Sequence, residues 1–150
     1  MKISTRVEYG LLALTDIAIN SEDGRAVSSA EIAERQNISQ KYLEQIMLGL
    51  RQGGFVKGQK GSRGGYQLSR PASKISLSEI LNALDNTILA DSYEADYTRT
   101  NEIRESVNNC LWSKLNGYMR CFTQQMTLSD LIKECKSPSG GNDSYHMYYI

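Results

Sequence analysis

Residues 38–70 read ISQKYLEQIMLGLRQGGFVKGQKGSRGGYQLSR and contain the two patterns from which the fold is predicted. The first half of this stretch has apolar residues at the i, i+3, i+4 and i+7 positions of one helix face, namely Leu43, Ile46, Met47 and Leu50. In the second half, glycines separate two short runs of strand-forming residues, and seven of the chain's twelve glycines lie from Gly49 to Gly65. The stretch therefore predicts a helix that begins after an N-cap at Ser39, followed by a β-hairpin with a glycine-rich turn.

Two further helical patterns precede this stretch. Apolar residues at helical spacing predict a helix from about Thr5 to Asn20. Ser28 and Glu31 form the capping box of a short helix that ends at Gln36, and a tight turn at residues 37–38 leads into the next helix. Three helices followed by a hairpin are the order of a winged helix-turn-helix, in which the recognition helix enters the major groove of DNA.

The basic residues are concentrated in the same region, although the net charge of the 150-residue chain is zero. From Arg35 to Lys74 there are eight basic residues and one acid, Glu44, whereas the part from Ser76 onward has six basic and ten acidic residues. Such a block is typical of a module that binds a polyanion, although a solvated basic face has the same composition. Combined with the helix-turn-helix order, the block favours DNA as the partner.

The candidate DNA contacts lie on the polar face of the third helix and on the hairpin. Side chains near the start of a recognition helix reach base edges, and Gln45 can form two hydrogen bonds with adenine. Basic side chains on the hairpin suit the phosphate backbone. A nucleotide-binding loop is the alternative for the glycine-rich turn, but the GKS or GKT sequence of such loops is missing. The candidate DNA-binding residues are Ser39, Gln40, Lys41, Tyr42, Glu44, Gln45, Arg51, Lys57, Lys60, Arg63 and Gly64.

The second half of the chain predicts an element for dimerisation. A fourth helix begins at the capping box of Ser76 and Glu79. After a linker, a long helix is expected from about Asn101 to Gln125, and a last short helix ends near Cys135. The apolar spacing of three and four residues continues along the long helix for more turns than a small core needs, which indicates packing against a partner subunit. The candidate dimerisation residues are Ile103, Val107, Leu111, Leu115, Tyr118 and Phe122.

These patterns divide the chain into three parts. Residues 1–85 are expected to form a winged helix-turn-helix DNA-binding domain, residues 86–136 the linker and the dimerisation helices, and residues 137–150 a flexible C-terminal tail. The predicted fold class is mainly α with a small β-hairpin. The tail is unusual because small residues from Ser137 to Ser144 lead into the bulky sequence YHMYYI.

Several segments resemble the Rrf2 family of bacterial transcriptional regulators. They are MKIST and YGLLAL near the start, residues 38–70 with their YLEQ and GGY motifs, ISLSEILNALD, and the later LW and MTLSDLI. The resemblance implies a winged helix-turn-helix with a long dimerisation helix, and homodimers that bind imperfect palindromes in double-stranded DNA. It places Glu44 where the family tunes base choice, and a carboxylate there can accept from cytosine N4. The resemblance also implies that the contact positions of the recognition helix and the wing are those of Ser39, Lys41, Tyr42, Gln45 and Lys60.

The cysteines bear on what such a regulator senses. Iron–sulfur members of the family carry three cysteines about five residues apart in the loop before the dimerisation helix, whereas residues 89–102 of this chain contain none. Cys110 and Cys121 are separated by about 16 Å along a helix axis, which neither one cluster nor a disulfide spans. We therefore expect no metal and no cofactor. Buried cysteines in a dimer interface are the main interpretation, and a redox role across the two-fold axis is the alternative.

The CymR branch of the family, the cysteine metabolism repressors, has no iron–sulfur cluster. The chain is most similar to this branch. That branch works with cysteine synthase and ends in an aromatic-rich tail with a terminal Tyr-Ile. The resemblance implies that Tyr149 and Ile150 bind the cysteine synthase active site, which accepts C-terminal peptides ending in isoleucine. The free carboxylate would fill the site for an amino-acid substrate, and the isoleucine its apolar part. A tail that packs on its own dimer, or is disordered, is the alternative.

Residues and resemblance together predict a homodimeric, sequence-specific DNA-binding transcriptional regulator. It is expected to repress genes of cysteine or sulfur metabolism and to be modulated by cysteine synthase. An Rrf2-type iron–sulfur or thiol redox-sensing regulator is the first alternative. An interaction protein that regulates cysteine synthase through its C-terminal tail is the second.

Other classes of protein are not expected. A catalytic site is not indicated, because the sequence has no nucleophile–base pair or paired carboxylates and its one histidine, His146, lies in the tail. No apolar run approaches the roughly 20 residues of a membrane span, and no signal peptide is recognised. Three widely spaced cysteines do not suggest a disulfide framework. We therefore expect a cytoplasmic protein without a membrane partner.

Overall fold

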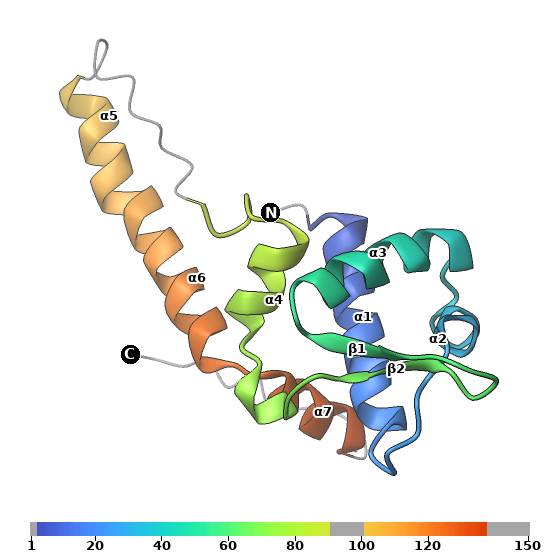
Figure 1. The fold of residues 1–150 in the computed structure, drawn as a ribbon. Coiled ribbons are helices and arrows are strands. Elements are labelled where there is room, and N and C mark those ends of the chain that lie inside the picture. The colour runs from blue at the N-terminus through green and yellow to red at the C-terminus, as the bar shows by residue number, and fades with distance from the viewer. Residues whose placement is uncertain (1–2, 91–100, 138–150) are drawn as a thin grey trace.

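The computed structural model describes residues 3–90 and 101–137, and its elements follow the order of a winged helix-turn-helix with a long helix after it (Figure 1). The prediction of a mainly helical fold with one small hairpin is confirmed. None of the described helices is long and apolar enough to cross a membrane. The elements of the first half are α1 (Thr5–Asn20), α2 (Ser29–Gln36), α3 (Gln40–Gln52), β1 (Val56–Gln59), β2 (Gly65–Leu68), a 3₁₀ turn (Ala72–Lys74) and α4 (Leu77–Leu84). Those of the second half are α5 (Glu102–Val107), a π-helical segment (Asn108–Trp112), α6 (Ser113–Gln125) and α7 (Leu128–Lys136).

Reciprocal hydrogen bonds fix the starts of α2 and α4, as the sequence predicts. The Ser28 N–H donates to Glu31 Oε2 at 2.8 Å, and the Glu31 N–H donates to Ser28 Oγ at 3.2 Å. Ser76 and Glu79 repeat this arrangement at 2.9 and 3.3 Å. The backbone and side-chain hydrogen bonds that each carboxylate accepts hold the pKa of both glutamates below its usual value. At α3 the N-cap is Ser39, as predicted, but its side chain makes no capping hydrogen bond.

The turn between α2 and α3 is tight because Asn37 adopts the left-handed conformation, with φ 53° and ψ 47°. Asparagine tolerates this conformation better than most residues do. The N–H of Ile38 donates to the Ala33 carbonyl at 2.9 Å, and the Ile38 side chain is buried immediately after the turn. The turn therefore anchors the start of α3 to the core.

One hydrophobic core joins the first four helices, the hairpin and α7. The predicted apolar stripe of α3 is fully buried, whereas Leu11 on α1 and Leu81 on α4 are only half-buried. Leu128 of α7 is completely buried, and its N–H donates to the Ile75 carbonyl at 2.9 Å. The last helix of the described chain thus returns to pack beside α1, close to the winged helix-turn-helix.

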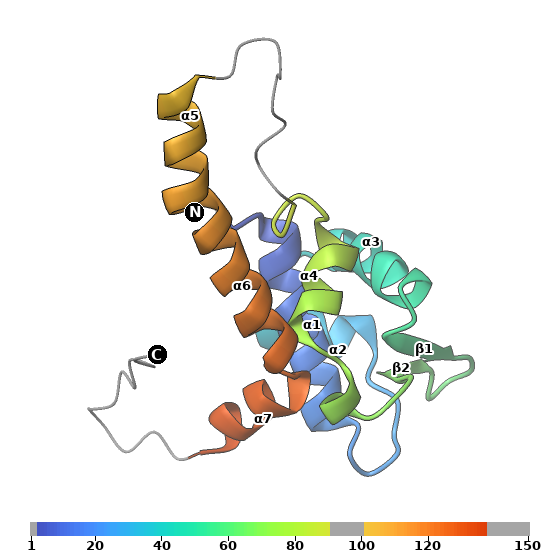
Figure 2. The same ribbon diagram turned by 90° about the vertical axis from the view of Figure 1, so that its left-hand side faces the viewer.

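The elements α5, π-helical segment and α6 form one continuous helix, whose α5 end extends away from this core (Figures 1 and 2). Its bounds agree with the predicted helix from about Asn101 to Gln125, but the π-helical segment within it is not predicted. The end of α6 packs against α4. There the Arg120 guanidinium donates to the Leu89 carbonyl at 3.0 and 3.2 Å, which holds the segment after α4 against the long helix.

Candidate nucleic-acid interface

The solvent-facing side of α3 carries most of the predicted DNA contacts. Because the buried stripe of α3 anchors its opposite side, this face points away from the core. Near the start of the helix, exposed side chains can reach base edges in a major groove. The predicted contact residues that are exposed here are Ser39, Gln40, Lys41, Glu44, Gln45 and Arg51.

Tyr42 lies at the edge of this face and is half-buried. Its ring meets the ring of Tyr9 on α1 edge to face, with 5.9 Å between the ring centroids and 71° between the ring planes. This geometry is favoured for aromatic pairs, so Tyr9 holds Tyr42 in a defined position relative to α1. Tyr9 is a residue that sequence reasoning missed.

Glu44 already has a hydrogen-bond partner on α3. Gln40 Nε2 donates to Glu44 Oε1 at 3.3 Å, one turn away on the exposed surface. Glu44 Oε2 can still accept from a base amino group, because an ionised carboxylate has about four acceptor sites. The two side chains therefore form one polar unit at the start of the helix.

The hairpin presents the other predicted cations, Lys57, Lys60 and Arg63, all of them exposed. Its turn needs glycine for two reasons. Gly61 has φ 111°, and a Cβ on Gly64 would lie 2.6 Å from the Gln59 carbonyl oxygen. The Gly64 N–H donates to the Gly61 carbonyl at 2.9 Å. In the structure Gly64 therefore shapes the turn that carries Lys60 and Arg63.

The sequence Gly65-Tyr66 fixes the hairpin against the start of α2. The Tyr66 N–H donates to the Val27 carbonyl at 2.7 Å, and the Val27 N–H donates to the Tyr66 carbonyl at 2.9 Å. A Cβ on Gly65 would lie 2.5 Å from the Val27 carbonyl carbon, so the approach requires glycine. In both views the hairpin and α3 lie on the side of the molecule away from the long helix (Figures 1 and 2).

Arg35 belongs to the basic block of the sequence but is neutralised by a buried acid on α1. Its Nε and Nη2 donate to the two Asp16 carboxylate oxygens at 2.9 and 2.6 Å, and Gln36 Nε2 donates to Asp16 Oδ2 at 2.7 Å. The Asp16 side chain is 1% exposed. Burial raises the pKa of Asp16, but the hydrogen bonds from Arg35 and Gln36 and the charge of Arg35 outweigh it, so this pKa lies below its usual value. The signal in the sequence for this network is Asp16 itself, an acid among the apolar residues of α1.

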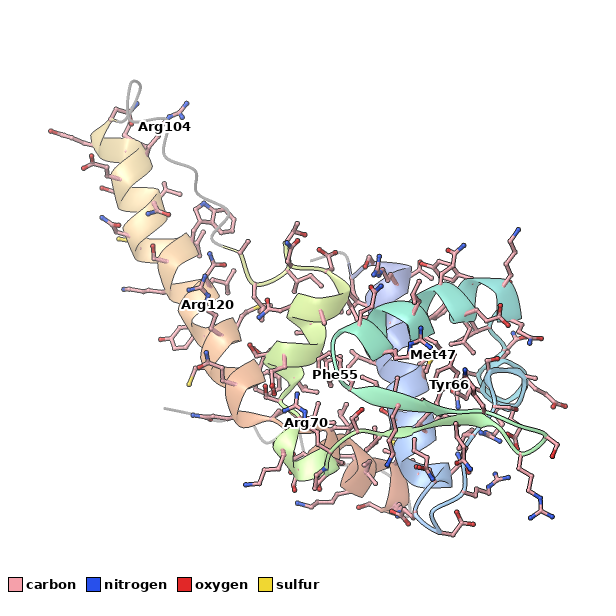
Figure 3. The ribbon with its side chains drawn as sticks, viewed as in Figure 1. Met47, Phe55, Tyr66, Arg70, Arg104 and Arg120 are labelled. Carbon is pink, nitrogen blue, oxygen red and sulfur yellow. The ribbon has the colours of Figure 1, made fainter. Side chains whose placement is uncertain are left out.

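Arg70 is neutralised as well. Its Nη2 donates to Glu79 at 2.9 Å and its Nη1 to the Lys74 carbonyl at 2.7 Å. Its guanidinium carbon lies 5.7 Å from the centroid of the Phe55 ring (Figure 3). Within the described ranges, the basic residues of the block without an ion pair are Lys41, Arg51, Lys57, Lys60, Arg63 and Lys74. The cationic surface is therefore smaller than the sequence suggests, and it centres on α3 and the hairpin.

The predicted dimerisation residues are exposed in the single chain. They follow one side of the long helix and reach 75% exposure at Ile103. A continuous apolar strip of this kind is typical of a surface that binds another protein. The strip consists of Ile103, Val107, Leu111, Leu115, Tyr118 and Phe122, with Trp112 also exposed nearby.

The described cysteines do not fit an iron–sulfur cluster within one chain. Cys110 lies in the π-helical segment, Cys121 on α6 and Cys135 on α7, and all three are exposed. Across residues 3–90 and 101–137, no three His, Cys, Asp or Glu side chains come together as metal ligands. The predicted tail contacts, Tyr149 and Ile150, lie outside the described residues.

The comparisons with known proteins agree with this geometry. The Rrf2 family model, described as an iron-dependent transcriptional regulator, matches residues 3–134. The transcriptional regulator IscR of Cereibacter sphaeroides is 39% identical over 141 residues, which are 92% of this chain and 91% of that protein. The solved structure of CymR, described as the global cysteine regulator of B. subtilis, is similar with a TM-score of 0.77 and 29% identity, over 89% of this chain and 98% of that one. The structure of T. potens IscR is similar with a TM-score of 0.74 and 31% identity, over 99% and 97%.

Proposed function

The chain belongs to the Rrf2 family of transcriptional regulators, and on that premise we propose that it binds a palindromic double-stranded operator as a homodimer and represses genes of cysteine or sulfur metabolism. The observation that carries the DNA-binding part is the exposed polar face of α3, held in place by its buried face, with the cationic hairpin on the same side of the molecule. The polar residues of α3 suit base edges, and the hairpin cations suit phosphates.

The homodimer is supported by the apolar strip on the long helix. A second copy with the same strip can cover these large apolar side chains, which the rest of the described chain leaves exposed. A two-fold axis through such an interface would present two α3 helices to successive major grooves. The operator would then contain two half-sites about one helical turn apart or a multiple of it.

The assignment to cysteine or sulfur metabolism is supported by similarity to CymR over most of the chain and by the absence of cysteine from residues 89–102. In this proposal, cysteine synthase modulates the regulator by binding Tyr149 and Ile150 at the end of the tail. The aromatic and apolar side chains of Tyr149 and Ile150 suit an apolar part of an enzyme's binding site.

A second candidate function, an iron–sulfur or thiol redox sensor, is favoured by the identity with IscR and by the iron-dependent description of the family. The positions of the cysteines oppose a cluster within one chain. Anaerobic reconstitution of the purified protein with iron and sulfide distinguishes the two candidates. We expect no stoichiometric iron–sulfur absorbance, and a stoichiometric cluster would overturn the cysteine-branch assignment.

Selection from a random library of DNA duplexes by the full-length protein tests the DNA-binding part. We expect one palindromic sequence to be enriched, bound by two protomers. Enrichment of no sequence would contradict the proposal.

Capture of cysteine synthase by the immobilised full-length protein tests the partner. Deletion of Tyr149 and Ile150 should abolish capture and leave DNA binding intact. The control is His146→Ala, which changes the tail but keeps its last two residues and should still capture the enzyme. Capture by the deletion variant would remove the tail from the interface.

A further inference from the structure

Leu48 is an apolar residue in the middle of the otherwise polar exposed face of α3. Its side chain is 48% exposed. Lys41 precedes it by two helical turns on the same line, and Gln45 and Gln52 lie one turn away on either side. Leu48 therefore shares a surface with the candidate base contacts.

The described chain leaves about half of this side chain uncovered. Ten large apolar side chains are exposed in the described ranges, and seven of them belong to the long helix. Ile3 and Leu12 line a cavity of about 570 Å³ between α1 and α7. That leaves Leu48. Single exposed leucines are common on proteins, so the position of this one, rather than its exposure, carries the inference.

The major groove offers one apolar group to such a side chain, the C5-methyl group of thymine. Cytosine presents an amino group and no methyl in the same groove. Leu48 follows Gln45 by three residues, which is about 4.5 Å along the helix axis, while neighbouring base pairs are about 3.4 Å apart. A base read by Leu48 would therefore neighbour the base read by Gln45.

We propose that Leu48 packs against a thymine methyl group in each half-site and makes that position selective for thymine over cytosine. This inference rests on the proposed DNA-binding function of α3. The proposed contact is apolar and determines specificity, whereas the other candidate contacts on this face are polar.

Replacement of thymine by deoxyuridine tests the contact, because deoxyuridine lacks only the methyl group and keeps the same base pairing. The probe is a duplex enriched by the full-length wild-type protein from a random library, with each thymine replaced in turn. For one thymine per half-site, we expect the affinity of the wild-type protein to fall about fourfold per methyl group removed, the value for burial of one such group. Leu48→Ala should show less than about a twofold change at the same position.

Two further variants complete the test. Leu48→Met keeps an apolar side chain of similar volume and should keep the sensitivity to deoxyuridine. Leu12→Ala removes a second exposed leucine, one that lies on α1, and should behave like the wild type. A wild-type protein that tolerates deoxyuridine at every position, or a Leu48→Ala variant that loses as much affinity as the wild type, would overturn the inference and leave DNA binding standing. A wild-type protein that selects no sequence would overturn both.

Discussion

The carboxylate of Asp16 on α1 accepts two hydrogen bonds from the guanidinium of Arg35 on α2, at 2.6 and 2.9 Å. Two parallel hydrogen bonds between planar groups fix orientation as well as distance. Because α2 leads directly through Asn37 into α3, this pair sets the position from which α3 presents its polar face. The pair thus connects the core of α1 to the candidate DNA surface.

Asp16→Asn should destabilise the fold, because the amide retains only one of the two acceptor oxygens that Arg35 binds and removes the charge that compensates it. We expect a loss of about 2 kcal/mol in the free energy of unfolding, the usual scale for hydrogen bonds to a charged group. Urea unfolding followed by circular dichroism measures it. Glu34→Gln, which changes an exposed acid on α2, is the matched control and should be near neutral. Equal stability of the two variants would show that the Asp16 network contributes nothing.

Acid should destabilise the protein through the same carboxylate and through the capping acids. The pKa values of Asp16, Glu31, Glu79 and Asp130 all lie below their usual values in the folded state. The unfolded chain therefore binds more protons than the folded one. The resulting stabilisation is complete above the ordinary pKa values, 3.8 for Asp16 and 4.5 for Glu31. It is lost as the pH falls through the lowered pKa values of the folded state. Measured from pH 7 to pH 3, the contribution of these groups to the free energy of unfolding should stay constant at first and then fall. A stability that rises below pH 4 would contradict the prediction.

Lys60→Ala should weaken DNA binding at every sequence, since the side chain is an exposed cation on the hairpin turn and is assigned to a phosphate. The slope of log affinity against log salt concentration should fall by about one unit for each lost contact. Fluorescence anisotropy over a salt series measures both quantities. Lys133→Ala, an exposed lysine on α7, serves as the control and should leave the slope unchanged. The hairpin would be removed from the contact set if Lys60→Ala kept the wild-type slope.

Gln45→Ala should reduce discrimination between sequences more than it reduces non-specific affinity. A lost two-pronged contact with a base costs about 1–3 kcal/mol of discrimination. The ratio of dissociation constants for a selected duplex and a scrambled one reports it. Gln124→Ala removes the same chemical group from the exposed surface of α6 and should not change the ratio. A specificity ratio that Gln45→Ala leaves intact would assign base reading to other residues.

Leu115→Asp should convert the proposed dimer to monomers, because it places a charge in the middle of the exposed apolar strip. Sedimentation velocity measures the association state at micromolar concentration. Ser113→Asp adds the same charge to the opposite side of the same helix and should remain dimeric. A dimeric Leu115→Asp protein would place the interface elsewhere.

Much of the fold was predictable from local patterns. The capping pairs Ser28/Glu31 and Ser76/Glu79 locate two helix starts because each pair satisfies backbone groups within four residues. The buried stripe of α3 is predictable because one helix face and a short neighbouring turn define it. Such features depend on residues close together in the sequence.

The parts that escaped prediction depend on long-range contacts. Arg35 and Arg70 count as free charges in the sequence, but their partners, Asp16 and Glu79, lie 19 and 9 residues away. The edge-to-face contact of Tyr42 with Tyr9 likewise joins two helices. Of the predicted contacts, the α3 and hairpin residues lie on one side of the molecule, while their roles toward DNA stay predictions.

Removing the α3 and hairpin contacts together shows whether this surface reads a DNA sequence. The measurement is the dissociation constant of the full-length protein for a duplex selected from a random library and for a scrambled duplex. It is made for the wild type and for the triple variant Lys41→Ala, Gln45→Ala and Lys60→Ala. We expect the wild type to prefer the selected duplex at least about a thousandfold and the folded triple variant to lose most of this preference. A wild type without preference, or a triple variant that keeps the full preference, would contradict it.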